Sequence, residues 1–524
     1  MTGEPSLALA LLPLGVTATA ACLALLAGLF VPARLRPAIN WLSVAALAAV
    51  VVICALTLPL AAAARPVLGD MWIADRMALV FDALVALVGG LALMVLGPFS
   101  REHGFAREEL PALVLFAVAG MIMVVHAAHL VSLLIGIETM SLAAYALVAC
   151  RPRSAPGAEG ALKYFLMGAL ATACFVYGLA LIYGTTGGEM SFSGIASRAA
   201  AAGGNPLFIV GVLLLVAALL FKVAAVPFHM WLPDAYEGAP TPVTGFMAAA
   251  IKAAAFGGLI RLLGSALGRP EVALGHSGWA NLLGPVAFAT MTLGNLAAIR
   301  QDSIKRLLAY SSIAHAGYLL VGVAALGHGV AAAQPALLFY LAAYAATTLG
   351  AFAVAAWVGR QGDECLRLDD WSGIARTRPA LALVMTLFLL SLAGVPPTGG
   401  FFAKFYLFRA AVEQPALIWL VVAAVLNSVV SVYYYLRIVV AMYFRERPEP
   451  ARGYASPATA VVLVLLAAVV LLLGVWPSPV LVPHRDSRAS GARAPLPHTA
   501  SPRPSRSFTP RARRLARRAA VRTG

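Results

Sequence analysis

Three lysines lie where a fixed positive charge would be costly. Of the 38 basic residues in the sequence, five are lysine and 33 are arginine. Lys222, Lys252 and Lys404 nevertheless lie deep in long apolar runs. A charged side chain at the centre of a bilayer costs at least about 2.5–3.5 kcal/mol without compensation. Arginine would stay protonated there, whereas a buried lysine can release its proton, so these positions indicate proton transfer.

Glu138, in the segment LLIGIETMSL, is the one carboxylate that the pattern places deep inside an apolar run. It is the expected ion-pair partner of a buried lysine, and moving the two ions apart would favour release of the lysine proton. The alternative is a static buried pair that serves only helix packing. One such pair does not need three lysines, which favours the first interpretation.

Three further titratable residues could either relay protons or have a purely structural role. Lys163 lies near the end of its run, where it either relays protons or extends to the membrane interface. His229 and His315 can titrate near neutral pH and could relay protons, although a lone histidine in a helix is often just hydrogen-bonded.

Four other charged residues receive structural interpretations. Lys305 lies beside Arg306 and is interpreted as a loop residue that sets membrane topology. Asp234 and Glu237 are expected to cap or anchor an unwound loop. Asp82, near a helix end, is given little weight.

Two apolar runs are interrupted by helix-breaking residues. Proline removes a backbone donor and clashes with the preceding turn. Unwound backbone survives at membrane depth only where protein or a water-filled cavity surrounds it, and two broken helices in corresponding places point to a transport site. Two ordinary proline kinks are the alternative. The segments are FKVAAVPFHMWLPD, broken at Pro227 and Pro233, and SLAGVPPTGGFFAKF, broken at Pro396, Pro397, Gly399 and Gly400.

The elements that must position these residues are predicted to be membrane-spanning helices. The chain of 524 residues is 61% hydrophobic and 11% charged, which excludes a soluble enzyme or a nucleic-acid-binding module. A spanning helix needs about 20 mainly apolar residues. We therefore predict an all-α polytopic membrane protein with about fourteen spans, at 6–31, 41–63, 77–97, 110–127, 130–150, 160–184, 206–228, 242–264, 278–298, 303–325, 335–358, 379–396 with 400–414, 416–443 and 457–482.

The two breaks are five helices apart, which suggests two five-helix repeats. Because five is odd, the repeats would have opposite orientations in the membrane. The predicted organisation is three N-terminal helices in 1–109, repeats in 110–264 and 278–444, a last helix in 457–482 and a basic tail in 483–524.

Basic residues in the loops favour an outside N-terminus, with sixteen on the inner side and six on the outer. The tail contradicts this rule, because eleven arginines from His484 to Gly524 would lie outside. It is either a disordered basic tail or the product of a shifted reading frame, and no function is assigned to it.

Motifs for cofactor binding are missing from the sequence. Its five cysteines are scattered without a CxxC or CxxCH motif, and neither a GxGxxG after a strand nor a Walker A loop is present. We therefore expect no cofactor or metal in this chain and no binding to nucleic acid.

Several long stretches resemble the subunit N family of proton-pumping NADH–quinone oxidoreductase (respiratory complex I). The resemblance runs from about residue 75 to 482. It rests on FKVAAVPFHMWLPDAYEGAPTPVTGFMAAAIKAAAFGGLIRLL, EGALKYFLMGALATACFVYGLALIYG, IKRLLAYSSIAHAGYLLVG and LSLAGVPPTGGFFAKFYLF. Carried over by position, Glu138 and Lys222 match the family's glutamate–lysine pair, Lys252 and Lys404 its central and twelfth-helix lysines, and Lys163 the sixth-helix lysine.

The resemblance implies a subunit of a proton-translocating enzyme complex in the bacterial inner membrane, held among other membrane-arm subunits and lipid. NADH, FMN, iron–sulfur clusters and quinone would belong to partner subunits. Two rival functions remain open. One is a subunit of a multisubunit cation/proton antiporter or membrane-bound hydrogenase, and the other is a structural member of the complex that conducts no protons.

Overall fold

The computed structural model describes residues 7–61, 66–359, 364–446, 454 and 456–476. They belong to one unit, Met1–Leu481, and a second unit, Val482–Gly524, lies outside the described residues. Regular secondary structure in the described part is helical, with isolated β-bridges only. The basic tail in 483–524 is not described, so both interpretations of it stay predictions.

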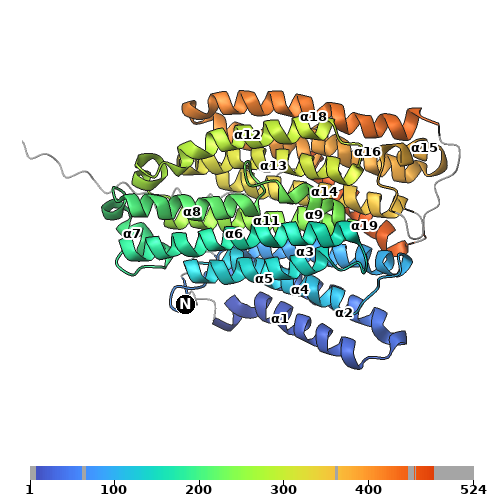
Figure 1. Cartoon of the computed structure of the whole chain (residues 1–524), viewed down its shortest axis with the longest axis horizontal. Helices are drawn as coiled ribbons and strands as arrows, with labels where there is room; N and C mark the ends of the chain where they lie inside the picture. The colour runs from blue at the N-terminus through green and yellow to red at the C-terminus, as the bar shows by residue number, and fades with distance from the viewer. Residues whose placement is uncertain (1–6, 62–65, 360–363, 447–453, 455, 477–524) are drawn as a thin grey trace, which may run out of the picture. The chain divides into compact units, whose positions relative to one another are not determined.

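The helices of the first unit lie side by side, from α1 (blue) at one edge to α18 (orange) at the other (Figure 1). Three π-helical segments, Met247–Ile251, Leu262–Ala266 and Glu271–Gly275, interrupt or follow them. The α-helices are α1 Leu7–Phe30, α2 Arg36–Thr57, α3 Arg76–Glu102, α4 Glu109–His126, α5 Leu130–Val148, α6 Ala155–Thr185, α7 Phe192–Ala202, α8 Pro206–Lys222, α9 Trp231–Gly238, α10 Thr241–Phe246, α11 Lys252–Arg261, α12 Trp279–Ile299, α13 Ile304–Gly327, α14 Ala333–Val358, α15 Ile374–Thr377, α16 Pro379–Ala393, α17 Gly399–Val412, α18 Ile418–Phe444 and α19 Pro457–Val475.

Each of the fourteen predicted apolar runs contains a helix. Within the described residues, twelve helical segments are long and apolar enough to cross a membrane. The shorter apolar helices α8 and α16 begin the two runs that were predicted to be broken. The all-α membrane architecture is confirmed, whereas the number of crossings, the domain bounds and the inverted repeats stay predictions. Helix α7 was not predicted.

The first break separates α8 from α9. Helix α8 ends at Lys222, and turns that include Pro227 lead to α9 at Trp231. The prediction of a break at Pro233 is wrong, because this proline lies in the first turn of α9. The first turn of a helix has no intrahelical partners for its N–H groups, so proline is tolerated there.

The second break separates α16 from α17 and contains Pro396 and Pro397. Gly399 and Gly400 were predicted to lie in the unwound part. This prediction is wrong, because they begin α17. The N–H of Gly400 donates to Ser391 Oγ at 3.1 Å, and a Cβ on this glycine would lie 1.8 Å from the Ser391 carbonyl oxygen. Glycine therefore allows the start of α17 to pack directly on the end of α16.

Small residues bring two pairs of helices into close contact. A Cβ on Gly120 of α4 would lie 2.3 Å from the backbone nitrogen of Met140 in α5. A Cβ on Gly294 of α12 would lie 2.6 Å from that of Ala314 in α13. Membrane helices commonly associate through such residues. The two pairs are the first two helices of each predicted repeat, which agrees with a repeated arrangement.

The most deeply buried spans in the described chain are α13, α14 and the segment Thr241–Ala266, which includes α10 and α11. Helices α1, α6 and α18 keep large apolar side chains on the outside, including Phe30, Leu170 and Leu426. This arrangement suits lipid around the periphery and polar residues at the centre.

We predict that Gly120→Ala destabilises the protein by about 1–3 kcal/mol, the usual cost of overpacking a tight interface. The added methyl would meet the α5 backbone, which cannot move aside as a flexible side chain could. Gly15→Ala in α1 is the matched control, because no atom lies within 4 Å of its added Cβ. The fraction of protein that stays extractable from membranes after heating would report stability. Equal midpoints for the two variants would contradict the prediction.

Candidate functional site

Lys222 is buried at the end of α8, and its ammonium donates to Ser141 Oγ of α5 at 2.7 Å. Glu138 lies one turn earlier on α5, half-buried, and accepts from Thr172 Oγ1 of α6 at 2.6 Å. In the described structure Glu138 and Lys222 form no direct ion pair. The Ser141 hydroxyl holds the ammonium instead.

The expectation that Glu138 is the one deeply buried carboxylate is wrong. Asp82 is fully buried and Glu364 is 7% exposed, whereas Glu138 is only half-buried. Asp82, placed near a helix end and given little weight from the sequence, is therefore more completely enclosed than the predicted site carboxylate.

Lys252 is the first residue of α11, directly after a π-helical segment. Its buried ammonium donates to the Ser312 carbonyl oxygen of α13 at 2.5 Å and to the Ser312 hydroxyl. The Tyr344 hydroxyl of α14 donates to the same serine hydroxyl at 2.9 Å. One serine thus connects the lysine to an aromatic side chain on a third helix.

His315 lies one turn beyond Ser312 on α13. Its Nδ1 is 2.7 Å from the Tyr340 hydroxyl and its Nε2 is 3.3 Å from the Tyr435 hydroxyl. The centres of the His315 and Tyr344 rings are 4.9 Å apart. The histidine therefore adjoins the tyrosine that is bonded to the Lys252 contact.

Lys404 lies in α17, just beyond the second break, and is buried. Its ammonium donates to the carbonyl oxygens of Leu392 and Ala393 at 3.0 and 2.8 Å, and to Ser428 Oγ of α18 at 2.8 Å. It also lies 5.2 Å from the centre of the Tyr318 ring, whose centre is 5.6 Å from that of His315. Lys252 and Lys404 are consequently joined by neighbouring polar and aromatic side chains.

Lys163 and His229 do not join this chain of contacts. Lys163 is 46% exposed and pairs with Glu159 and Asp234 at 2.6 and 2.7 Å. Asp234 also pairs with Arg306 of α13 at 2.9 Å. It was predicted to cap or anchor an unwound loop, but it lies in α9 and connects this helix to α13. His229 is half-buried in the first break, where its Nδ1 has no hydrogen-bond partner among the described residues.

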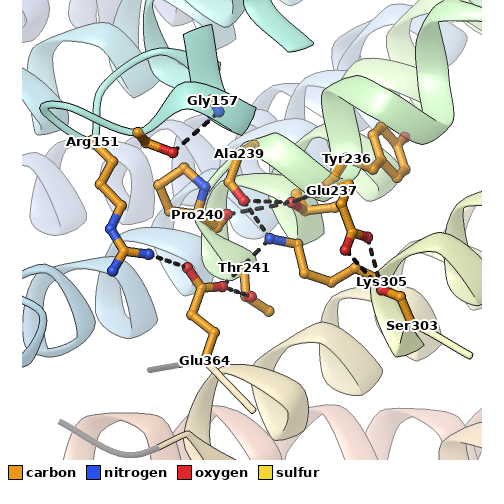
Figure 2. A network of polar contacts seen from close by, with 12 residues as sticks. Arg151, Gly157, Tyr236, Glu237, Ala239, Pro240, Thr241, Ser303, Lys305 and Glu364 are labelled. Carbon is orange, nitrogen blue, oxygen red and sulfur yellow. Dashed lines mark hydrogen bonds and ion pairs between the residues drawn. The ribbon is translucent and has the colours of Figure 1, made fainter. Parts of the chain in front are cut away.

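The interpretation of Lys305 as a loop residue is wrong, since it lies in the first turn of α13 and is 1% exposed. Figure 2 shows its ammonium at the centre of a polar network, where it donates to the Ala239 carbonyl oxygen at 2.5 Å and lies 3.4 Å from Glu364 Oε2. Glu364 also accepts from Arg151 at 3.0 Å and from the Thr241 hydroxyl.

The network joins the segments around the first break to the second predicted repeat. Glu237 accepts from Ser303 Oγ, the N-cap of α13 (Figure 2). It lies in α9 and not in the unwound loop that it was predicted to cap or anchor. Burial of Glu364 acts to raise its pKa, but Lys305, the Thr241 hydroxyl and Arg151 together hold this pKa below the ordinary value. The carboxylate is therefore a fixed charge that ties α10, α13 and the loop between α5 and α6 together.

Comparisons with known proteins define the class first. The family described as NADH:quinone oxidoreductase/Mrp antiporter, transmembrane, matches residues 127–431. That range contains both breaks and all three deeply buried lysines. The fold is thus that of an antiporter-like membrane subunit.

Individual relatives define the family more closely. NADH-quinone oxidoreductase subunit N 1 of Sorangium cellulosum is 48% identical over 413 residues, which cover 77% of this chain and 81% of the relative. A chain in the structure of respiratory complex I from Thermus thermophilus with bound aureothin is 34% identical, with a TM-score of 0.74 over 90% of this chain and 98% of that one. The chain belongs to the NADH-quinone oxidoreductase subunit N family.

The fold is shared more widely. A chain of the Mrp complex from Dietzia is 24% identical and gives a TM-score of 0.76, covering 90% of this chain and 96% of that chain. At this identity the likeness concerns the fold alone.

We predict that Glu364→Gln destabilises the protein by about 3–5 kcal/mol at pH 7, because it leaves the buried Lys305 ammonium without its counter-charge. Since the folded-state pKa of Glu364 is lowered, its stabilising effect is present above the ordinary value of 4.5 and is lost as pH falls through the folded-state pKa. The difference in stability between the variant and the wild type should therefore become smaller below pH 4.5. Thermal stability in isolated membranes across pH would measure it.

Glu446→Gln is the control for this experiment. Glu446 pairs with Arg376 at 3.0 Å, but its side chain is 80% exposed, and an exposed pair contributes little. A Glu364→Gln variant as stable as Glu446→Gln at pH 7 would contradict the fixed-charge role.

Proposed function

We propose that this chain is a proton-translocating membrane-arm subunit of a bacterial NADH–quinone oxidoreductase, in which Lys222, Lys252 and Lys404 carry the protons. One observation supports this most strongly. From Lys252 to Lys404 the buried side chains are in sequential contact, through Ser312 and then Tyr344, His315 and Tyr318.

The contacts suggest a role for each part. Every one of the three ammonium groups is held by hydroxyl or carbonyl oxygens, which can accept a hydrogen bond but do not cancel a charge. Protonation of each lysine is therefore sensitive to charges nearby. Glu138, one turn from the Ser141 contact, would modulate Lys222 by its field. Lys252 would pass the proton toward Lys404 along the lysine axis, which consists of Lys222, Lys252, Lys404 and the contacting side chains between the last two.

Lys404 would exchange protons with the far side through the second break, whose carbonyl oxygens it contacts. His315 would relay between Lys252 and Lys404. His229, in the first break, and Lys163, at a more exposed place, would connect the axis to water. These roles rest on position and chemistry together, since imidazole and lysine can both exchange protons.

Electron transfer would take place in other subunits. The cysteines are scattered in the sequence, and the lysines and hydroxyls of the buried axis are not the ligands of iron–sulfur clusters. We propose that this chain holds no redox site and no cofactor, and that partner subunits bind NADH, FMN, iron–sulfur clusters and quinone. Its own partners would be other membrane-arm subunits and the lipid bilayer of the inner membrane.

The main alternative is a subunit of a cation/proton antiporter or of a membrane-bound hydrogenase. The Mrp relative supports the fold alone at 24% identity, whereas the subunit N relative reaches 48%. A purely structural subunit is the second alternative. It would not need its buried lysines to titrate, and this difference can be tested.

We predict that Lys222→Arg, in the assembled complex, lowers proton uptake by about tenfold or more, because arginine keeps the charge but does not release its proton. NADH-driven proton uptake into inverted membrane vesicles would be measured together with NADH–quinone turnover. Assembly would be checked on native gels.

Arg376→Lys is the control, since it conserves charge at an exposed pair whose side chains are 65% and 80% exposed. This variant should pump as the wild type does. Normal proton uptake by Lys222→Arg would show that its charge alone suffices and would favour the structural alternative.

A further inference from the structure

Asp82 and His126 form a buried pair that the proposed lysine axis does not use. Asp82 lies in the second turn of α3, and His126 is the last residue of α4. His126 Nε2 is 2.7 Å from Asp82 Oδ2, and both side chains are 0% exposed. Trp72 stacks on the imidazole with ring centres 4.2 Å apart.

Each member of the pair has one further polar atom without a hydrogen bond. Asp82 Oδ1 and His126 Nδ1 are buried and have no partner among the described residues. Leaving a buried polar atom unpaired costs about 1–3 kcal/mol. A pair that served packing alone would be expected to satisfy these atoms. Free atoms at both ends of a hydrogen-bonded acid–base pair are what proton exchange needs.

The neighbouring titratable groups come from α2, α3 and α11, the elements packed against the pair. Arg261, the last residue of α11, pairs with Asp75, the N-cap of α3. Its Nε donates to the Val125 carbonyl oxygen, adjacent to His126, at 2.8 Å. Cys54 of α2 is a further titratable group that interacts with Asp82. Arg261 and Asp75 neutralise each other, so the charge of the cluster changes only with the pair itself.

The pair lies near the opposite end of α11 from Lys252. Nine residues separate Lys252 from Arg261, about 13–14 Å along a helix. Between them, Gly257 brings α11 close to α3 and α4. A Cβ there would lie 2.7 Å from Val125 Cγ1 and 3.3 Å from the Phe81 ring, and these residues directly precede His126 and Asp82.

Irregular backbone marks both ends of this helix. The π-helical segment Met247–Ile251 ends directly before Lys252, and Leu262–Ala266 begins directly after Arg261. Such segments occur frequently at functional sites. The helix that carries the central lysine is thus irregular beside the lysine and beside the arginine that contacts the α4 end.

The pair is also on the membrane face that is otherwise poor in ion pairs. The other ion pairs found in the described chain, apart from Arg261–Asp75, involve the loops and helix ends that contain most of the basic residues. By the distribution of loop charges, the face with these basic loops and ion pairs is the inner one. Asp82 and His126 therefore lie toward the outer face.

We propose that Asp82 and His126 form a proton-exchange site between Lys252 and the outer membrane face. This proposal rests on the proposed function of the lysine axis. It adds a route from Lys252 along α11 toward the outer face.

The Asp82–His126 pair would bind and release one proton at a time. In the empty state Asp82 is a carboxylate and His126 is neutral, with its Nε2–H donating to Oδ2, so the pair has a charge of −1. A proton that binds Nδ1 makes the pair neutral overall. Binding at Asp82 Oδ1 would do the same, with the Nε2–H···Oδ2 hydrogen bond left in place, and loss of the bound proton from either atom restores −1. The two unpartnered atoms are the places of uptake and release.

The test uses Asp82→Asn in the full complex, since asparagine keeps the size and the hydrogen bond but cannot titrate. Proton uptake per NADH oxidised should fall about fivefold or more in inverted vesicles, as expected when an acid–base group is removed from a transfer step. Its dependence on pH should also flatten. Asp70→Asn is the matched control, because Asp70 is exposed in the loop before α3 and asparagine tolerates its positive φ of 63°. This control should behave as the wild type.

A second variant separates titration from folding. Asp82→His combined with His126→Asp keeps both titratable groups in exchanged positions, and it should recover proton uptake and pH dependence relative to Asp82→Asn. Wild-type uptake and pH profile in assembled Asp82→Asn would overturn the proposal. So would failure of both variants to assemble, which would show that the pair is structural.

Lys222→Arg, measured in parallel, distinguishes this proposal from the proposed function. Loss of proton uptake in Lys222→Arg with normal proton uptake in Asp82→Asn would contradict the Asp82–His126 proposal alone. Normal proton uptake in Lys222→Arg would contradict the proposed function, on which the Asp82–His126 proposal rests.

Discussion

The structure depends on how three buried ammonium groups are held by neutral oxygen atoms. Lys222, Lys252 and Lys404 each donate to oxygens of serine side chains or of the backbone. These contacts replace part of the hydration that a charged group loses on burial. Because they supply no negative charge, they leave the protonated lysine less stable than a direct carboxylate partner would. A proton can therefore be bound and also released.

The second helix break and its lysine are one feature rather than two. Because α16 stops at Ala393, the last carbonyl groups of that helix have no helical donor, and Lys404 donates to two of them. Gly394, at φ 89°, and Gly400 shape the turn that allows this approach. The first break is used differently. Lys222 is itself the last residue of α8, and its ammonium is held by Ser141 of a neighbouring helix.

Sequence patterns predicted the long apolar helices, the two interruptions and the burial of Lys222, Lys252 and Lys404, because apolar length, proline and charge are local properties. They did not predict α7 or the burial of Lys305. They did not predict which helices meet. Ser141 is 81 residues from Lys222, and Glu364 is 59 from Lys305, so tertiary packing alone brings them together. For the same reason the expected Glu138–Lys222 pair is replaced by a serine contact. Serine and tyrosine at Ser312 and Tyr344 have no distinctive pattern in a helix, so these connections had no sequence signal.

Two kinds of buried charge occupy different places in this fold. Around Lys305, both Lys305 and Arg151 pair with Glu364, which also accepts from the Thr241 hydroxyl and is thus shared by three segments. Such charges cannot change their protonation without loss of stability. Along the lysine axis the partners are neutral, and in the Asp82–His126 pair two polar atoms have no hydrogen-bond partner within the described part of the chain. The completeness of pairing thus separates the groups that hold helices together from the groups that can exchange protons, a distinction that burial alone does not make.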